Sequence, residues 1–462
     1  MKKLSSFMTL LLLCTMTFTA CKDKNEVTNN DSNSSSNNSA NAMTADQQKE
    51  YLENSGKQIL ATFKTVDQKE AVELADGLYR KYESYDWESI GEDLAQIDDG
   101  RYDNFFAMPG RLARFANGEQ VPTARDILVF SFAECAYNFE VDEAKRTIRY
   151  SKSVDGTCTA TFRDELGNTC VLKAWGEGAA KEYEYSYEST NRDGSKTTKT
   201  IQAQIPATTH MVLMQGKTEV INCAFGLDAL KNDHIYVTFN LKVTNVAILF
   251  DTRVNSTHAT ALYEFSYGDQ KLIAATADLP KYKLIDKQDN QDWEEWIEQY
   301  EDRYEELLRA IGAGYSTLNL MNLVNIKASI SDGGLLYSEV VAWDERGNRN
   351  TKESVKNFCD IFNKYMYGAV FFPSDPATEQ MLVKLQPRSY EGYQYNPETD
   401  DYEETTCYEP EPVIYFPKDK SSYAFEDYFT SERFNTILTL TENLINSYID
   451  LDNEFDLGHV EF

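Results

Sequence analysis

The sequence predicts an α+β fold built from an N-terminal helical hairpin, a central antiparallel β-meander and a C-terminal mixed α+β region. Apolar residues recur every three or four positions over 46–126, alternate with polar residues over 127–282, and follow both patterns over 283–462. These spacings are the periods of amphipathic helices and of half-buried strands. Length alone allows two or three domains in this part of the chain.

The helical region contains two capping boxes, each followed by apolar residues at helical spacing. Thr44 with Gln47, and Thr65 with Gln68, have the spacing that satisfies free backbone N–H groups where a helix starts. The predicted helices cover 44–63, 65–84 and a short stretch over 87–97, with the first two packed as an antiparallel pair.

The clearest strand of the meander covers 235–243, where every second residue is apolar. Such alternation indicates an antiparallel sheet with one solvated face. Similar segments recur between turn-prone stretches, so we expect a meander that curls into a half-barrel or barrel, or folds as a sandwich. The apolar side chains of this strand are Ile235, Val237, Phe239, Leu241 and Val243.

The C-terminal region mixes both periods. A stripe that includes Trp293 and Trp296 predicts a helix through Ile311. The remaining predictions are strands over 325–331 and 335–343, and helices over 355–367 and 434–448.

The chain opens with a leader in which Lys2 and Lys3 precede a short apolar run over 7–18. This pattern is typical of a secretion signal, and the run is shorter than the ~20 residues that span a bilayer. Phe18-Thr19-Ala20-Cys21 resembles the lipobox of bacterial lipoproteins, with Phe18 where Leu is usual. The resemblance implies removal of 1–20 and lipidation of Cys21; an ordinary signal peptide is the alternative.

Residues 21–45 are rich in Asn and Ser and predict a flexible tether after the lipidated cysteine. The charged stretch over 22–26 is partly similar to the tags that direct some Gram-negative lipoproteins to the cell surface. We therefore expect a lipid-anchored protein of the outer membrane of a Gram-negative bacterium, facing the periplasm or the cell surface.

The chain is strongly acidic. Without the two leader lysines, 43 basic residues stand against 75 acidic ones, a net charge of −32. This balance argues against nucleic acid as a partner. The expected partners are the membrane, through the anchor, and an envelope protein or a glycan.

Six cysteines lie beyond the lipidation site, which leaves fifteen possible pairings open beside buried free thiols. The turn expected at 164–168 places Phe162, rather than Cys158, opposite Cys170, so a bond between those two cysteines is not expected. The six are Cys135, Cys158, Cys170, Cys223, Cys359 and Cys407.

No motif for nucleophilic, nucleotide-dependent or metal-dependent catalysis is present, so no cofactor, metal or catalytic residue is predicted. His234 and His258 each begin a predicted strand and could meet as ligands or as an acid–base pair, although solvated histidines are the simpler interpretation. His210 and His459 complete the set. Asp450, Asp452 and Glu454 have partial calcium-loop spacing, but Phe455 stands where that motif needs Gly.

The segment over 387–417 is rich in Tyr, Glu and Pro and predicts a long irregular loop; a hairpin arm whose tyrosines pack on the domain is the alternative. Tyrosines combine contact area with a hydrogen-bonding tip, which suits docking on a protein or stacking on sugars. The candidate binding residues are Tyr390, Tyr393, Tyr395, Tyr402 and Tyr408.

These features favour a non-catalytic binding or assembly lipoprotein. One alternative is a carboxylate-dependent glycoside hydrolase, which needs only Asp and Glu. Another is a lipid carrier, in which Val237, Phe239 and Leu241 line a concave wall that no helix covers.

Overall fold

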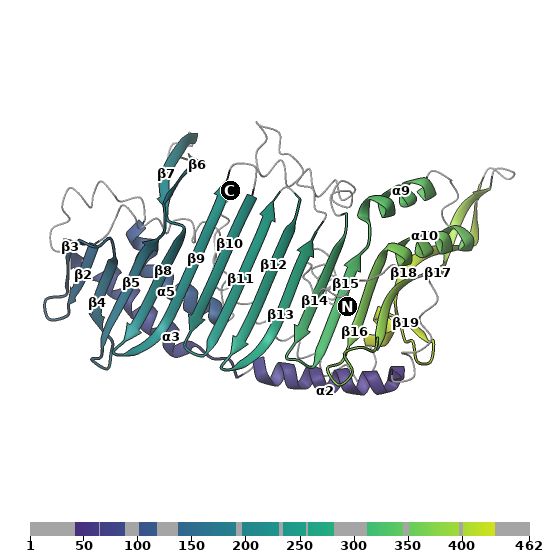
Figure 1. Cartoon of the computed structure of the whole chain (residues 1–462), viewed down its shortest axis with the longest axis horizontal. Coiled ribbons are helices and arrows are strands. Elements are labelled where there is room, and N and C mark those ends of the chain that lie inside the picture. The colour runs from purple at the N-terminus through teal and green to yellow at the C-terminus, as the bar shows by residue number, and fades with distance from the viewer. Residues whose placement is uncertain are drawn as a thin grey trace.

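The computed structural model describes residues 42–63, 65–87, 101–117, 137–190, 196–230, 234–255, 257–280, 312–344, 351–396 and 401–429. Within these ranges, seventeen strands form one mixed, mostly antiparallel sheet that is not closed. Helices pack on it, so the α+β class is confirmed. The sheet is one long open layer (Figure 1), so it is neither a closed barrel nor a two-sheet sandwich.

The pairings give the spatial order of the strands as β1-β3-β2-β4-β5-β8, followed by β9 to β19 in sequence order. The first strands are β1 (Asp86–Trp87), β2 (Tyr137–Asp142), β3 (Thr147–Lys152), β4 (Cys158–Arg163), β5 (Thr169–Glu177), β8 (Thr208–Gln215) and β9 (Thr218–Leu230). The remainder are β10 (His234–Val243), β11 (Val246–Asn255), β12 (Ala259–Tyr267), β13 (Gln270–Leu279), β14 (Gly314–Leu320), β15 (Val324–Ile330), β16 (Met366–Phe371), β17 (Met381–Asn396), β18 (Asp401–Tyr415) and β19 (Ser422–Ala424).

Two features of this order bear on the expected organisation. β6 (Lys181–Thr190) and β7 (Lys196–Ile205) form a separate two-stranded ribbon that projects between β5 and β8 (Figure 1). β13 pairs with β14, so the same sheet continues across the boundary expected near 282.

The alternation predicted for the meander is present in β10. Phe239, Leu241 and Val243 are buried, whereas Asn240 and Lys242 between them are exposed. The predicted turn at 164–168 is also present, and it pairs Phe162 with Cys170 as expected.

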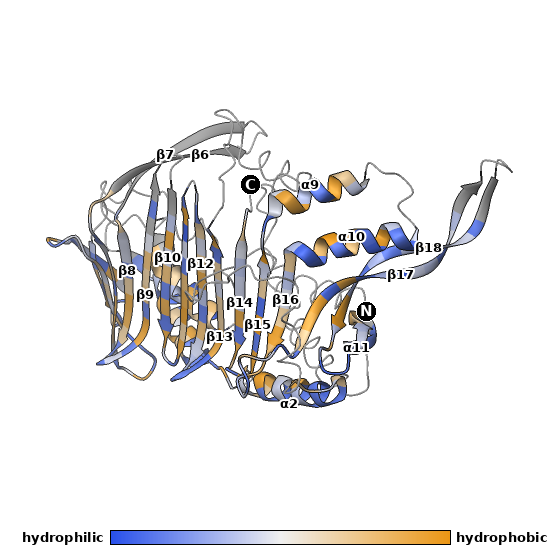
Figure 2. Ribbon diagram, turned by 45° about the vertical axis from the view of Figure 1, so that its right-hand side comes forward, coloured by the Kyte–Doolittle hydropathy of each residue, from blue (hydrophilic) through white to orange (hydrophobic). Residues whose placement is uncertain are grey.

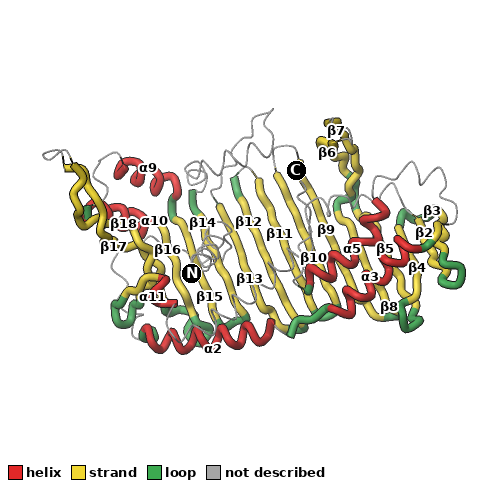
Figure 3. The backbone as a smooth tube through the Cα atoms, turned by 180° about the vertical axis from the view of Figure 1, so that it is seen from behind, coloured by secondary structure: helices red, strands yellow, loops and turns green. Residues whose placement is uncertain are grey.

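The prediction that the first two helices pack as an antiparallel pair is wrong. Helices form over α2 (Ala45–Phe63) and α3 (Lys69–Ser84), but α3 packs against α5 (Arg101–Ala116) instead of α2. Phe105 and Phe106 of α5 contact each other edge to face, and both rings lie near Phe139 of the sheet. Because the sheet offers this larger apolar surface, α3 and α5 cover it together (Figure 3).

α2 instead lies along the C-terminal half of the sheet, on the same face as α3 and α5 (Figure 3). It shares a small core with Met381, Ile414, Phe416 and Tyr428. The buried Gln48 side chain donates hydrogen bonds to the backbone oxygens of Met43 and Gln380, which fixes the helix to strands far along the chain.

The strand predicted over 335–343 is wrong, because this segment forms the helix α9 (Gly333–Asp344). Apolar residues lie on all sides of it, so neither period is decisive. The carboxylate of Asp332 accepts a hydrogen bond from the backbone N–H of Leu335 at 2.9 Å, and this cap favours the helix.

The neighbouring predictions are confirmed. The strand expected over 325–331 is β15, and the helix expected over 355–367 is α10 (Lys352–Tyr365). A short helix, α11 (Phe425–Phe429), follows β19. The helices predicted through Ile311 and over 434–448 lie outside the described residues, as does most of 87–97, of which Trp87 belongs to β1.

Among the described residues, no helix combines the length and the apolar character that crossing a bilayer requires.

The packing of α5 on the sheet predicts a large effect for Phe105→Ala. Phe105 is fully buried, and truncation of such a ring costs ~3–5 kcal/mol because it leaves a cavity. Urea unfolding should show a loss of that size in the free energy of unfolding. Leu166→Ala is the control: Leu166 is 86% exposed in a turn, and its change should stay within about 0.5 kcal/mol. Equal effects for the two variants would contradict the assigned core.

Candidate functional site: an aromatic arm at the end of the sheet

The tyrosine-rich segment is not an irregular loop. β17 and β18 form a hairpin paired continuously from Leu382 with Tyr415 to Asn396 with Asp401. Its outer part extends past the rest of the sheet (Figures 1 and 2). We call residues 386–396 and 401–411 the arm. The hairpin of the alternative interpretation is therefore observed, although Tyr393 does not pack on the domain as that interpretation expected.

Only the base of the hairpin has further strand neighbours. β16 pairs with β17 as far as Leu382, and β19 pairs with β18 from Val413 onward. Both edges of the arm beyond these positions have no strand neighbour within the described part of the chain.

α10 supports the base of the arm. It packs against β17 and β18, and the Asn363 side chain makes two hydrogen bonds with the backbone of Leu385. The Asn363 amide donates to the Leu385 carbonyl at 2.9 Å and accepts from its N–H at 2.9 Å, as a neighbouring strand would. No sequence pattern points to Asn363, because this contact joins residues 22 positions apart.

The positions of the prolines explain why the sequence pattern predicts an irregular loop instead of this hairpin. The outward contact of Leu385 shows that Leu385 and its partner Pro412 direct their backbone groups away from each other. Pro387 and its partner Pro410 lie two positions further along, so they have the same orientation. All three prolines therefore stand where an N–H would point outward from an edge, where proline is tolerated. They interrupt the sequence pattern without interrupting the ladder.

The register separates the candidate tyrosines into two groups. Directly paired residues share a face, and side chains alternate along each strand. Positions 393, 395, 402 and 408 fall on one face of the arm, and position 390 falls on the other. Tyr395 and Tyr402 are direct partners, whereas Tyr393 pairs with Glu404 and Tyr408 with Ser389.

Tyr393 is the most accessible described tyrosine of the arm, with 69% of its surface exposed. Tyr390 is 39% exposed and Tyr408 is half-buried. The face of the arm that carries Tyr393 and Tyr408 is therefore the part of the arm most accessible to a ligand.

Tyr390 has a structural role on the opposite face. Its ring and the buried Cys407 thiol occupy the space beside Gly392, where a Cβ atom would lie 2.9 Å from the sulfur and 3.0 Å from the ring. Desolvation raises the pKa of the Tyr390 phenol, and the adjacent Cys407 and Glu409 raise it further. Tyr390 thus covers a glycine in the strand.

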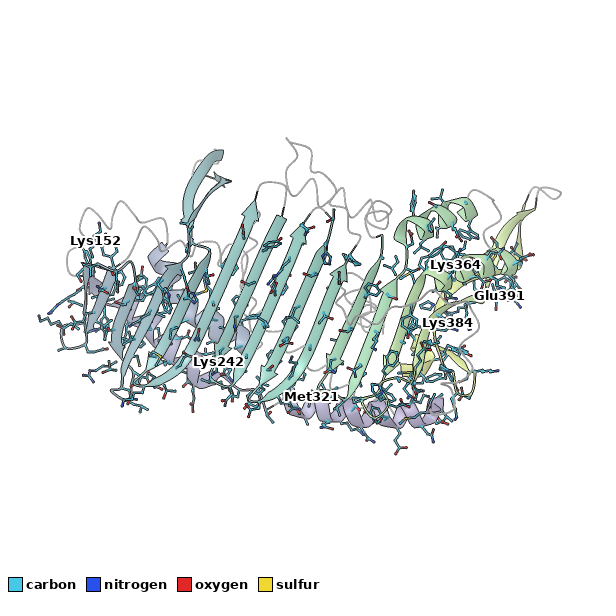
Figure 4. All side chains as sticks on the ribbon, in the orientation of Figure 1. Lys152, Lys242, Met321, Lys364, Lys384 and Glu391 are labelled. Atoms are coloured by element: carbon cyan, nitrogen blue, oxygen red, sulfur yellow. The ribbon has the colours of Figure 1, made fainter. Side chains whose placement is uncertain are left out.

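The arm is acidic. It contains Arg388 as its single basic residue against six acidic residues, a net charge of −5. Arg388 forms an ion pair with Glu411 at 2.9 Å. Figure 4 shows Glu391 on the outer part of the arm and Lys384 at its base, where the ammonium lies 4.2 Å from the centre of the Tyr415 ring.

The histidines do not form a common site in the described residues. His258 contacts the carboxylate of Asp278, and His210 lies 3.0 Å from a Glu177 oxygen and stacks on Trp175. His234 is separated from His258 by β11, and His459 lies outside the described residues.

The described cysteines are buried, and no disulfide joins Cys158 to Cys170, as expected. Burial raises the pKa of Cys223 to about 12, and it is the main cause that raises the pKa values of Cys170 and Cys359 to about 11. Such thiols are poor nucleophiles at neutral pH. Among the described residues, no cluster of His, Cys, Asp and Glu could hold a metal ion; Cys21, Cys135 and 450–454 lie outside them.

The wall proposed for a lipid carrier is occupied. Helix α5 packs against β9, β10 and β11, and the Phe115 ring lies 6.1 Å from the ring of Phe239. A helix thus fills the place where an acyl chain would have to lie.

A scan against protein-family models finds no match for this chain, and comparisons with curated proteins and with solved structures find none either.

The contact between Gly392 and Cys407 predicts that Gly392→Ala disturbs the arm. The added methyl group has no room and should displace the Tyr390 ring, at a cost of ~1–3 kcal/mol. Native-state alkylation followed by peptide mass spectrometry should then show faster modification of Cys407. Gly77→Ala, where a Cβ meets nothing within 4 Å, is the control. Unchanged Cys407 protection in Gly392→Ala would refute the assigned packing.

Proposed function

We propose that this chain is a non-catalytic, lipid-anchored protein of the bacterial envelope that binds a protein partner through the arm. The observation that carries the proposal is the projecting hairpin, on which the Tyr393 side chain is 69% exposed.

Binding through side chains fits the arm better than addition of a strand. At the base of the arm, Pro387, Pro410 and Pro412 remove outward N–H donors from the two edges, and Asn363 occupies the edge at Leu385. Strand addition depends on those donors. Tyrosines, in contrast, supply rigid contact area at low entropic cost and are enriched among residues that dominate binding energy.

The charge of the arm indicates the partner's chemistry. With six acidic residues and one arginine, which is already paired with Glu411, the arm complements a basic surface with apolar pockets for the tyrosines. Association should weaken as salt increases, because rim charges mainly steer encounter.

The proposed anchor and tether would hold this interaction near a membrane. A lipid on Cys21, followed by an Asn- and Ser-rich tether up to residue 41 with a typical reach of roughly 25 Å, would hold the acidic body clear of anionic lipids. The proposed location is the outer membrane of a Gram-negative bacterium, on its periplasmic or external face.

Replacement of Cys21 tests the anchor. In Cys21→Ser, the protein should leave the membrane fraction, and mass spectrometry of the wild-type amino terminus should detect the lipid. Cys14→Ser, within the leader, is the control and should remain membrane-bound. An unmodified Cys21 in the wild type, or a Cys21→Ser protein that stays in the membrane fraction, would contradict the proposed lipid anchor.

Substitution of Tyr393 tests the arm. A photo-crosslinking residue at position 393 should capture the partner in cells, and the same residue at position 315 should not. With the captured protein purified, Tyr393→Ala should lower affinity by at least tenfold, since loss of a dominant aromatic contact costs ~2 kcal/mol or more. Tyr315→Ala is the matched control, because Tyr315 is 48% exposed on β14. Equal affinities of the Tyr393→Ala and Tyr315→Ala variants for the partner would contradict the proposed role of the arm.

A further inference from the structure

The opposite end of the sheet carries a shallow depression of about 390 Å³. Its floor and sides come from β2, β4 and β5 and from the turn that joins β3 to β4. Volumes of this size lie at the small end of ligand pockets, ~300–1,000 Å³. The lining of the depression includes Asn138, Ser153, Asp155, Thr159, Lys173 and Trp175.

The depression lies on the sheet face opposite the main core. On β5, Leu172 and Ala174 are buried in the core shared with α3 and α5, whereas Lys173 and Trp175 alternate with them and point to the other face. No described helix packs against β2, β4 or β5 on that side. The site is therefore open to solvent over the described part of the chain.

The Trp175 side chain forms one wall of the depression. It pairs directly with His210 of β8, and the two rings stack at 5.0 Å between centroids with 14° between their planes. His210 is held in turn by Glu177. The depression lies on the β4 side of Trp175, away from β8, so the ring face turned from His210 borders it.

The remaining wall is polar and partly fixed in orientation. The Thr159 hydroxyl donates to the Asn138 side-chain oxygen at 2.5 Å, which directs the Asn138 amide nitrogen elsewhere. Asp155 accepts from the Ser153 hydroxyl at 2.7 Å and from the Thr157 backbone N–H at 3.0 Å, and these bonds orient its carboxylate. Lys173 is exposed beside them. An amide, a carboxylate and an ammonium thus surround one aromatic face.

We propose that this depression binds a pyranose unit of a neutral glycan. A sugar ring has an apolar face that stacks on an indole and a rim of hydroxyls that both donate and accept hydrogen bonds. One carboxylate and one ammonium line the site, so its local charge is balanced and favours neither an anionic nor a cationic ligand. Hydrolysis of a glycoside uses two carboxyl groups, and Asp155 is the single acidic residue lining the depression, which fits binding.

This site lies at the other end of the sheet from the arm (Figure 1), so occupation of one leaves the other free. The proposal therefore stands independently of the arm and of its protein partner.

The test uses the purified full chain in affinity electrophoresis and calorimetry with soluble β-glucan, mannan, xylan and galactan. At least one polysaccharide should bind the wild type, and Trp175→Ala should weaken that binding by at least tenfold, with Trp175→Phe intermediate. His210→Ala should also weaken it, because the wall loses its support. Tyr315→Ala is the aromatic control, and Tyr393→Ala should bind the glycan normally.

Circular dichroism melts establish that each variant is folded, and Lys173→Ala and Asn138→Ala provide surface variants if Trp175→Ala does not fold. Both should reduce glycan affinity. Absence of wild-type binding to all four polysaccharides, or full binding by the Trp175 and Asn138 variants, overturns the proposal.

Discussion

The antiparallel ladder that runs without a break from β8 to β18 is the constraint on which the rest of the structure depends. From β9 to β15, each strand pairs with a neighbour on both sides, which satisfies most of its backbone N–H and C=O groups. An open layer has two faces, and alternation makes one face of each strand apolar. That face needs cover, which α3 and α5 provide toward the N-terminal end and α2 provides toward the C-terminal end (Figure 3).

An open sheet also has two edges, and both are kept short. β1 contains two residues and β19 contains three, so neither offers a long row of unpaired backbone groups. The arm is longer, but at its base Pro387, Pro410 and Pro412 remove outward donors, and Asn363 satisfies the backbone of Leu385. These features hinder pairing with other strands at the base of the arm.

One candidate site lies where the strand ladder ends, and the other lies on a sheet face that the described helices do not cover. At one end, β17 and β18 continue past β16 and β19, and the hairpin projects with tyrosines on one face. At the other end, the helices cover one face of β2 to β5 and leave Trp175 on the other. Both sites use aromatic side chains on strands, which hold them more rigidly than loops would.

Local sequence patterns determined much of this protein. They predict the α+β class, the strand over 235–243, the helix over 355–367 and the turn that pairs Phe162 with Cys170, and the structure contains all four. They also pointed to the tyrosines of the arm. Each of these depends on periodicity or on a few neighbouring residues, which is the range over which a sequence pattern carries information.

Tertiary structure alone decided the remainder. The segment 335–343 is apolar on all sides, so its periodicity does not distinguish helix from strand, and its packing against α10 accompanies the helix. The choice of α5 as partner for α3, the face on which each tyrosine lies and the stacking of Trp175 on His210 depend on strand register and on contacts between distant residues. Because a strand's register is set by its neighbours in space, a single sequence does not specify which side chains meet across a sheet.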